Sequence, residues 1–520
     1  MFVDARNLPD GQSLDAEICI LGAGAAGISM ALALRDQGFR VIVIESGGFE
    51  QEESTQALYE GVIEGHAYNA LDETRLRYFG GSTNHWAGHC RPLDTIDFKA
   101  RPWMPNSGWP FQLPELVPYY RKAEALCELE PFPYPNGVWD GEPGQRPFPF
   151  DPNTVITSRY GNSRPTRFGS RYRADMADAA NVACYLHLNV IELETDHAGR
   201  SVTGVRLATL EGKSFHASAK VFVLALGGIE NARLLLLSNT VQRAGLGNQN
   251  DLVGRYFMDH VIARSGKLLP FGPPRRLPLD LYNVGRPKHG VLVLTEDAMR
   301  AHELPNATVF VRRVAVPTAE AVRSLKTILR MFSDREWPDD LDEHVANVVW
   351  DIDDVVRATY WRLTGQPRPL KNIGLDTRLE TLPDPENRIV LTDRKDRLGQ
   401  NQVQLRWSLD SIKLADIRKL HQIIGLEAGK TGFGRIQIEL DAEAPVWPER
   451  RLYGNHHIGT TRMHAEPRQG VVDAQCRVHG LSNLFIAGSS VFPTSGASNP
   501  TLTIVALALR LAEHIKSVIG

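Results

Sequence analysis

Residues 17–45 read EICILGAGAAGISMALALRDQGFRVIVIE. The apolar runs at 17–22 and 40–45 are typical of short buried strands. Between them a Gly-rich turn opens into an apolar segment that predicts a helix, with Gly38 just past its end. Strand, turn, helix and strand in this order make the first βαβ unit of a parallel sheet. We therefore expect an α/β domain of the Rossmann type.

Gly22, Gly24 and Gly27 form a G-x-G-x-x-G pattern at this turn. The first glycine permits the tight turn, the second lets the backbone approach a pyrophosphate, and the third lets the helix sit close to the sheet. The N–H groups and dipole at the start of the helix favour phosphates. Glu45 ends the second strand, where it can accept hydrogen bonds from a ribose and would repel a 2′-phosphate. A Gly-rich turn that merely packs a helix is the alternative, but the whole pattern favours a dinucleotide, either FAD or NAD.

The bulk composition describes an ordinary soluble globular protein, with 42% hydrophobic and 23% charged residues. Its 520 residues exceed one hydrophobic core, which predicts two domains or one domain with an insertion. The formal net charge of -3, without long runs of one sign, argues against nucleic acid or a polybasic membrane patch. No apolar run reaches the ~18 residues of a membrane span. The N-terminus lacks signal-peptide features, which predicts a cytosolic protein.

The cysteines are scattered and none forms a CxxC pair, which predicts reduced thiols, not disulfides or a zinc site. No HExxH motif or carboxylate cluster accompanies the histidine pair His456-His457, whose side chains should point apart. We therefore expect no metal site.

The rest of the chain divides by pattern. Residues 92–170 are rich in proline and aromatics and predict long loops, whereas 262–450 alternate in a way that predicts an antiparallel sheet with helices. Further strands of the first domain are expected near 184–193, 202–207, 220–226 and in LSNLFIAGSS, with helices in GGIENARLLLLS and NPTLTIVALALRLAEHIKSVIG.

Three further stretches are rich in small residues, and one of them carries a histidine pair. Residues 78–92 read YFGGSTNHWAGHCRP, 454–463 read GNHHIGTTRM, and 484–504 read LFIAGSSVFPTSGASNPTLTI. The glycines of the first stretch, with Ser82 and Thr83, allow a backbone to pass close to a flat ring. With the N-terminal fingerprint, these stretches resemble the glucose–methanol–choline (GMC) oxidoreductase family.

The family's C-terminal signature is a histidine, two spacers and G-T-x-R-M, which here reads HHIGTTRM at 456–463. The segments LALGGIENARLLLLS and GRYFMDH (254–260) are similar too. GGSTNHW and ASNPTLT look most like pyranose oxidases and related bacterial sugar dehydrogenases. The chain departs from the usual pattern at His464, where the family has glycine, and at 488–490, where many members carry an aspartate near the flavin.

The resemblance implies a discontinuous, Rossmann-like α/β domain that binds FAD, plus an α+β substrate-binding domain with an antiparallel sheet. The expected boundaries are 1–100, 181–261 and 451–520 for the FAD-binding domain, 101–180 for a loop-rich covering segment, and 262–450 for the substrate-binding domain.

The resemblance also implies that His456 is the catalytic base and Asn499 its polar partner. A histidine with an unperturbed pKa near ~6.5 suits proton removal from an alcohol at neutral pH. An asparagine can donate to the substrate oxygen without competing for the proton. His457 is the rival base. Asn499 could instead cap the helix that begins at Pro500, or Ser498 could take that role.

We expect FAD to contact residues from every FAD-binding segment. They are Gly22, Gly24, Ala25, Ala26, Gly27, Glu45, Ser46, Gly80, Gly81, Ser82, Thr83, Asn84, His85, Trp86, Val190, Ala225, Gly488, Ser489, Asn499, Pro500 and Thr501. His85 stands where some pyranose oxidases attach FAD covalently, although a packed loop histidine is the favoured interpretation. The helix start at Pro500–Leu502 is expected to face the pyrimidine side of the ring.

The substrate is expected to be a small-molecule alcohol, with a sugar, glycoside or polyol favoured. Its lining could include Arg75, Arg77, Tyr78, Arg378 and Glu380, or these could be solvated surface charges; Trp350, Trp361 and Trp407 could stack on a sugar or fill the core. O2 or another acceptor would reoxidise the flavin, and an oligomer is possible.

Three other functions stay open from the sequence. A lyase of the same family would keep FAD without hydride transfer, and a nicotinamide dehydrogenase would purify colourless. A tailoring oxidase of a secondary-metabolite alcohol would show the flavin spectrum but ignore free sugars.

Overall fold

The computed structural model describes residues 1–134, 138–139, 141, 143, 145–164, 166–272, 278–315, 320–334, 337, 340–364, 370–410, 413–440 and 452–519. Its centre is a parallel sheet of six strands. In spatial order these are β1 (Phe2–Asp4), β8 (Val182–Leu186), β4 (Val41–Ile44), β3 (Ile18–Leu21), β12 (Val221–Leu224) and β21 (Leu484–Ile486). Every residue of β3, β4, β12 and β21 is buried, as their unbroken apolar runs predict.

The chain leaves β3 in one direction for β4 and β8, and later adds β12 and β21 on its other side. The order therefore reverses beside β3, and ligands of such sheets bind at the carboxyl ends of the strands at this point. The α/β prediction from residues 17–45 is confirmed.

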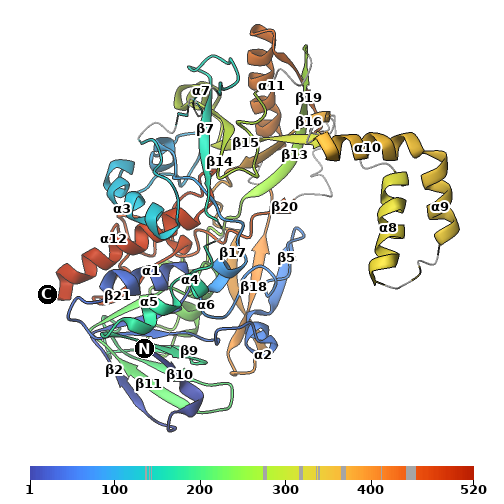
Figure 1. Ribbon diagram of the computed structural model, residues 1–520. Helices are drawn as coiled ribbons and strands as arrows, with labels where there is room; N and C mark the ends of the chain where they lie inside the picture. Colours follow the sequence, from blue (N-terminus) through green and yellow to red (C-terminus); the bar gives the residue numbers. More distant parts are fainter. Residues whose placement is uncertain are drawn as a thin grey trace.

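Helix α1 (Ala25–Leu34) ends earlier than the position of Gly38 suggests. Asn181 causes this, because its Nδ2 donates to the carbonyls of Leu34 and Phe39, and its Oδ1 accepts from the N–H of Asp36. The side chain thus caps the helix end from outside the local sequence, and Gly38 lies in the following turn. Helix α12 (Thr501–Ile519) packs against α1 (Figure 1).

The prediction of loops throughout 92–170 is wrong in two places. Helix α3 (Leu113–Leu126) begins with a capping box between Gln112 and Glu115 and packs on α12. Its two prolines mask the helical pattern, although one lies in the first turn, where no N–H bond is lost. Strand β7 (Val155–Asn162) also crosses this segment.

The antiparallel sheet predicted for the second domain is confirmed. Its path is β19 (Gly434–Ile438), β13 (Val261–Pro270), β16 (Leu370–Leu379), β15 (Ala307–Ala315), β14 (Lys288–Leu294), β7 and β6 (His89–Cys90), with β20 (Leu452–Tyr453) paired to β13. Helices α11 (Leu414–Lys430) and α7 (Glu296–His302) accompany it. One of its strands, β7, comes from the segment predicted as loops.

Two small sheets flank the main ones. One contains β2 (Ser13–Asp15), β11 (Ser214–Ser218), β10 (Val202–Ala208) and β9 (Asn189–Thr195), and the other β17 (Arg388–Lys395), β18 (Asn401–Trp407) and β5 (Gly61–Gly65). The remaining helices of the body are α2 (Glu53–Gln56), α4 (Phe168–Arg171), α5 (Arg173–Asp178) and α6 (Glu230–Leu237).

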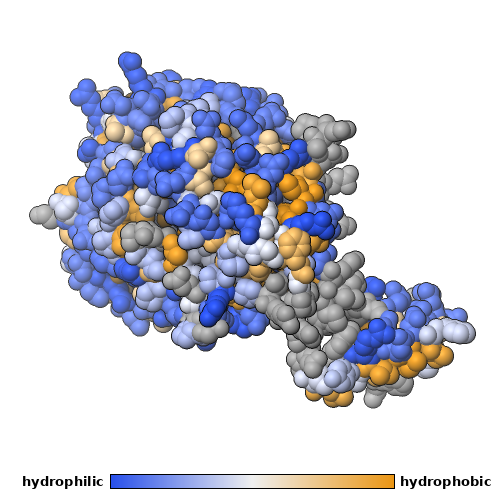
Figure 2. Space-filling view, turned by 90° about the horizontal axis from the view of Figure 1, so that it is seen from above, coloured by the Kyte–Doolittle hydropathy of each residue, from blue (hydrophilic) through white to orange (hydrophobic). Residues whose placement is uncertain are grey.

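The chain between β15 and β16 forms an arm of three helices that projects from the body (Figure 1). It comprises α8 (Glu320–Asp334), α9 (Leu341–Trp350) and α10 (Ile352–Thr364). Apolar side chains lie along part of its surface (Figure 2). Trp350, at the end of α9, is 84% exposed. Among the described residues no helix has both the length and the apolar character needed to cross a membrane.

Candidate active site

A cavity of about 830 Å³ opens at the carboxyl ends of the parallel strands. The loops after β3, β4, β12 and β21 line one side, and residues of β13, β15 and β16 line another. Almost all of the predicted contact residues lie in its wall: Gly22, Gly24, Ala25, Ala26, Glu45, Ser46, Gly81, Ser82, Thr83, His85, Trp86, Val190, Ala225, His456, Gly488, Ser489, Asn499, Pro500 and Thr501. The cavity therefore brings the N-terminal glycine turn together with the motifs at 454–463 and 484–504, as a shared FAD site requires.

Gly27, Gly80 and Asn84 lie outside this lining. Gly27 packs the helix on the sheet instead, because a Cβ there would stand 1.9 Å from the Gly22 carbonyl oxygen. Asn84 turns away, since its Nδ2 donates to the Phe79 carbonyl at 2.9 Å. The turn of helix η3 (Gly81–Asn84) presents Gly81, Ser82 and Thr83 to the cavity.

The glycines of the cavity wall leave room for a bound group. A Cβ added to Gly24, Gly227 or Gly488 would meet no protein atom within 4 Å, although all three line the cavity. A Cβ on Gly22 would instead stand 2.6 Å from the Ala225 carbonyl oxygen, so this glycine serves close packing of the strand ends. Open space at Gly24 and crowding at Gly27 are the arrangement that a pyrophosphate at the helix start needs. The residues present therefore fit FAD.

The carboxylate of Glu45 accepts hydrogen bonds from backbone N–H groups in and next to the glycine turn. Its Oε2 accepts from Ala23 N at 2.8 Å and its Oε1 accepts from Gly47 N at 3.1 Å. Burial raises the pKa of this carboxyl, and the two N–H donors oppose that rise. Glu45 thus shapes the turn, and its remaining lone pairs are available to a ribose hydroxyl.

Gly24→Val separates FAD binding from folding. Gly24 has an extended backbone conformation that valine can adopt, and an added Cβ there would meet no protein atom within 4 Å. We expect the apo protein to keep its melting temperature and to lose FAD affinity about 100-fold, or about 2.7 kcal/mol. Gly27→Ala is the matched control and should destabilise the apo protein by about 1–3 kcal/mol. Flavin titration and thermal unfolding measure the two effects; a Gly24→Val protein that binds FAD normally would contradict the assignment.

His456 is held by a chain of hydrogen bonds that determines which of its ring nitrogens is free. His260 Nε2 lies 2.7 Å from the Gly496 carbonyl oxygen, and His260 Nδ1 lies 2.8 Å from His456 Nδ1. Because a carbonyl only accepts, His260 donates from Nε2 and in its neutral form accepts at Nδ1. His456 therefore donates from Nδ1, which leaves the lone pair on His456 Nε2.

Both imidazoles are held neutral. Burial, with the nearby Arg378 cation, lowers the pKa of His260 to about 3. Burial also lowers the pKa of His456 well below its ordinary value, and the neighbouring His260 and Arg378 lower it further. A neutral histidine can accept a proton, so His456 Nε2 can act as a base.

Asn499 stands beside this lone pair. Its Nδ2 lies 3.4 Å from His456 Nε2, and its Oδ1 accepts from Arg378 Nη1. The arginine thereby fixes the amide so that its NH2 group faces the histidine. Asn499 does not cap α12, and neither does Ser498, whose Oγ donates to the Pro92 carbonyl and accepts from Arg91.

Asp259 fixes the loop that carries the base. Its Oδ1 accepts from the N–H of His456 at 2.8 Å and of His260 at 2.7 Å, and its Oδ2 accepts from Tyr68. Burial raises the pKa of this carboxyl to about 6, against the effect of its donors. Asp259 and His260 end the GRYFMDH segment, to which the sequence analysis assigned a family resemblance but no role in the site. The adjacent aspartate and histidine were the sequence feature that could have indicated such a role.

His457 has a different environment from His456. Its ring packs against Phe257 at 5.8 Å, its Nε2 is buried without a hydrogen-bond partner in the described part of the chain, and its carbonyl accepts from Ser489. Burial lowers the pKa of His457 to about 3. It also lines the cavity, but among the described residues no chain of hydrogen bonds fixes its tautomer.

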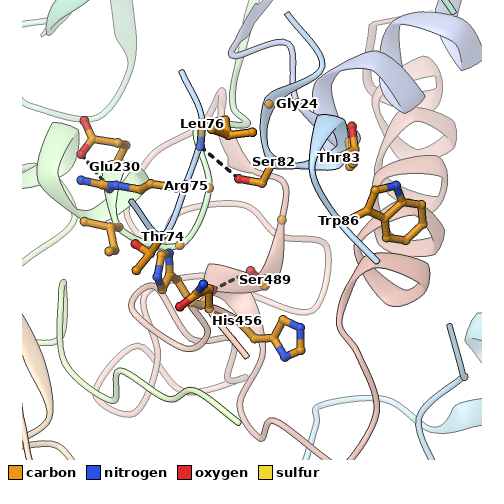
Figure 3. Close-up of a pocket in the computed structure, with 18 of the residues that line it drawn as sticks. Gly24, Thr74, Arg75, Leu76, Ser82, Thr83, Trp86, Glu230, His456 and Ser489 are labelled. Carbon is orange, nitrogen blue, oxygen red and sulfur yellow. Dashed lines mark hydrogen bonds and ion pairs between the residues drawn. The ribbon is translucent and has the colours of Figure 1, made fainter. Parts of the chain in front are cut away.

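The charged and aromatic residues that the sequence analysis considered for substrate binding lie in different parts of the structure. Arg75 pairs with Glu230 at 3.0 Å (Figure 3). Arg77 donates to Ser46, the residue after Glu45, at 2.8 Å. Arg378 lies beside Asn499. Glu380 is buried in an ion pair with Arg101 and is absent from the lining, as is Tyr78.

Neither Trp350 nor Trp407 lines the cavity. Trp407 is fully buried against Phe257 and Tyr68, so it fills the core. Trp350 faces solvent on the arm, and the side chain of Trp361 lies outside the described residues. Within the described ranges no three His, Cys, Asp or Glu side chains gather as a metal site.

Two models of known protein families match this chain. The model of the FAD dependent oxidoreductase family matches residues 17–244, and the GMC oxidoreductase model matches 383–508, which includes His456 and Asn499. This chain belongs to the GMC oxidoreductase family. It is therefore an FAD-dependent oxidoreductase.

Relatives of this GMC oxidoreductase align over nearly its whole length. The fructose dehydrogenase large subunit of Gluconobacter japonicus is 25% identical over 97% of this chain and 98% of its own. The 6'''-hydroxyparomomycin C oxidase of Streptomyces lividus is 25% identical over 96% of this chain and 91% of its own. The solved structure of pyridoxine 4-oxidase from Mesorbium loti shares the fold, with a TM-score of 0.56, 17% identity and coverage of 96% and 98%.

Proposed function

We propose that this enzyme oxidises a CH–OH group of a sugar, glycoside or polyol to a carbonyl, with His456 as the base. The observation that carries the proposal is the chain from Gly496 through His260 to His456, which leaves an unprotonated Nε2 at the cavity beside the Asn499 amide. The activities named for the two aligned relatives, a fructose dehydrogenase and a 6'''-hydroxyparomomycin C oxidase, support the substrate class.

His456 Nε2 would accept the hydroxyl proton of the substrate, while Asn499 Nδ2 donates a hydrogen bond to the same oxygen. FAD, when bound, supplies the acceptor for the hydride that leaves the carbon as the C=O bond forms. We also propose that FAD is held by the cavity residues named above without a covalent bond. His85 is exposed at the cavity wall and is the residue at which a covalent link would be expected. Flavin fluorescence of the denatured chain on a gel would reveal such a link and contradict non-covalent binding.

The test is anaerobic mixing of the holoenzyme with monosaccharides, glycosides, polyols and simple alcohols. Bleaching of the flavin band near ~450 nm by polyhydroxylated alcohols is expected. Bleaching by simple alcohols alone would contradict the substrate class, and no bleaching by any alcohol would favour cleavage chemistry without net redox change. O2 and artificial acceptors can then be compared as oxidants of the reduced enzyme.

The pH dependence follows from the lowered pKa of His456. Because a base with a lowered pKa stays unprotonated as pH falls, kcat/KM for a neutral alcohol should hold through pH ~6.5 and decline only well below it. Arg378→Met removes a cation that lowers this pKa, so its acid limb should move to higher pH. Steady-state profiles check both, with flavin content measured at each pH; an acid limb at pH 6.5 or above in the unmodified enzyme would contradict the prediction.

A further inference from the structure

Arg378 is a buried cation in the wall of the active site. It lies on β16, is 6% exposed and lines the cavity. Its Nη1 donates to Tyr160 Oη at 3.2 Å and to Asn499 Oδ1, and its guanidinium lies 5.0 Å from the centre of the Phe310 ring. All three neighbours are neutral, so they satisfy donors without balancing the charge.

The acids nearest to Arg378 along the strand are already paired. Asp376 accepts from Arg312 at 2.8 and 3.2 Å, and Glu380 accepts from Arg101 at 2.6 and 2.8 Å. Among the described residues no carboxylate forms an ion pair with Arg378. A buried charge without a counter-ion is costly, and proteins retain one where a ligand supplies the opposite charge.

Donors of this guanidinium remain unused. In the described part of the chain its Nε has no hydrogen-bond partner, and its Nη2 makes no hydrogen bond. Arginine is suited to carboxylates because its planar donors form charge-assisted hydrogen bonds with them. Arg378 contacts Asn499, which contacts His456, so an anion held here would lie near the carbon that is oxidised.

We propose that Arg378 binds a carboxylate of the substrate, so that the preferred substrates are acidic sugars or other polyhydroxylated hydroxy acids. This inference rests on the proposed function, because it assumes that His456 and Asn499 receive the alcohol group. It narrows the substrate class to compounds in which a carboxylate lies within a few bonds of the oxidised carbinol.

The test compares D-glucuronate and D-gluconate with their neutral counterparts D-glucose and D-glucitol. Binding is followed through the change in flavin absorbance before reduction, and reduction through anaerobic bleaching, for the unmodified holoenzyme and for Arg378→Gln and Arg378→Lys. The acids should bind about 10- to 100-fold more tightly than the neutral compounds. Arg378→Gln should lose this preference, while Arg378→Lys keeps part of it.

Arg406→Gln is the matched control, because Arg406 is a half-exposed arginine paired with Glu64 and lies outside the cavity lining. It should retain the preference for acids, and flavin content and melting temperature verify that each variant is folded. Equal binding of acids and neutral sugars would overturn the inference. A loss of reduction rate in Arg378→Gln that is equal for acidic and neutral substrates would also overturn it, by assigning Arg378 to the hydroxyl oxygen.

These outcomes differ from failure of the proposed function. If neutral sugars bleach the flavin in a His456-dependent manner and acids bind no better, the carboxylate assignment is wrong and the proposed function stands. If no alcohol, acidic or neutral, bleaches the flavin, the proposed function is wrong.

Discussion

His456→Ala is expected to lower the rate of substrate-dependent flavin reduction by about 10²- to 10⁴-fold while FAD stays bound. The substitution removes Nε2, the ring nitrogen that the contacts with His260 leave unprotonated. FAD should remain bound, because the open space at Gly24 and Gly488 and the loops that surround it are untouched. Stopped-flow anaerobic reduction gives the rate, and the visible spectrum gives the flavin content.

His457→Ala is the matched control for this experiment. His457 packs against Phe257, and in the part of the chain that the structure describes no hydrogen-bond chain orients its ring. Its loss should therefore change the reduction rate by less than about tenfold. If His456→Ala reduced at the normal rate and His457→Ala did not, the base would be His457. His260→Gln should fall between the two, since His260 positions the base and does not itself contact the Asn499 amide.

Glu380→Gln is expected to destabilise the protein by about 3–5 kcal/mol. Its carboxylate forms a fully buried ion pair with Arg101 and also accepts from the N–H groups of Asn306 and Gly496. The amide would leave Arg101 as an unpaired buried charge, and Gly496 is the residue whose carbonyl orients His260. The variant should therefore melt at a lower temperature, and its reduction rate should fall as the 494–499 loop loses this anchor.

The double variant Glu380→Gln/Arg101→Met tests the cause, because it removes the stranded charge and should be more stable than the single variant. Arg406→Gln breaks an exposed pair with Glu64 and should change stability by less than about 1 kcal/mol. Chemical denaturation with flavin absorbance and circular dichroism measures all three. A Glu380→Gln protein as stable as the unmodified one would contradict the argument.

The pattern of apolar residues and glycines was enough to predict those helices and strands whose position depends on neighbouring residues in the sequence. The strands of residues 17–45, their glycine turn and the helix at the C-terminus follow from apolar runs and glycine positions, because neighbours in sequence set the burial and the backbone conformation there. The end of α1 could not be predicted, since Asn181 caps it from 147 residues away. Helix α3 was missed because its prolines obscure a segment that α12 stabilises by packing.

The sequence by itself determined a dinucleotide fold and, through its motifs, predicted His456 and Asn499 as the catalytic pair. Only the tertiary structure decided which nitrogen of His456 is free, because the Gly496 carbonyl, His260 and His456 meet through contacts that span 196 and 236 residues. It also decided that Arg378 is a buried cation beside Asn499 with no ion-pair partner among the described residues, whereas Glu380, two residues further along the chain, is a structural anchor. Tautomer and charge balance depend on which groups lie within a few ångströms, and chain distance carries no information about that.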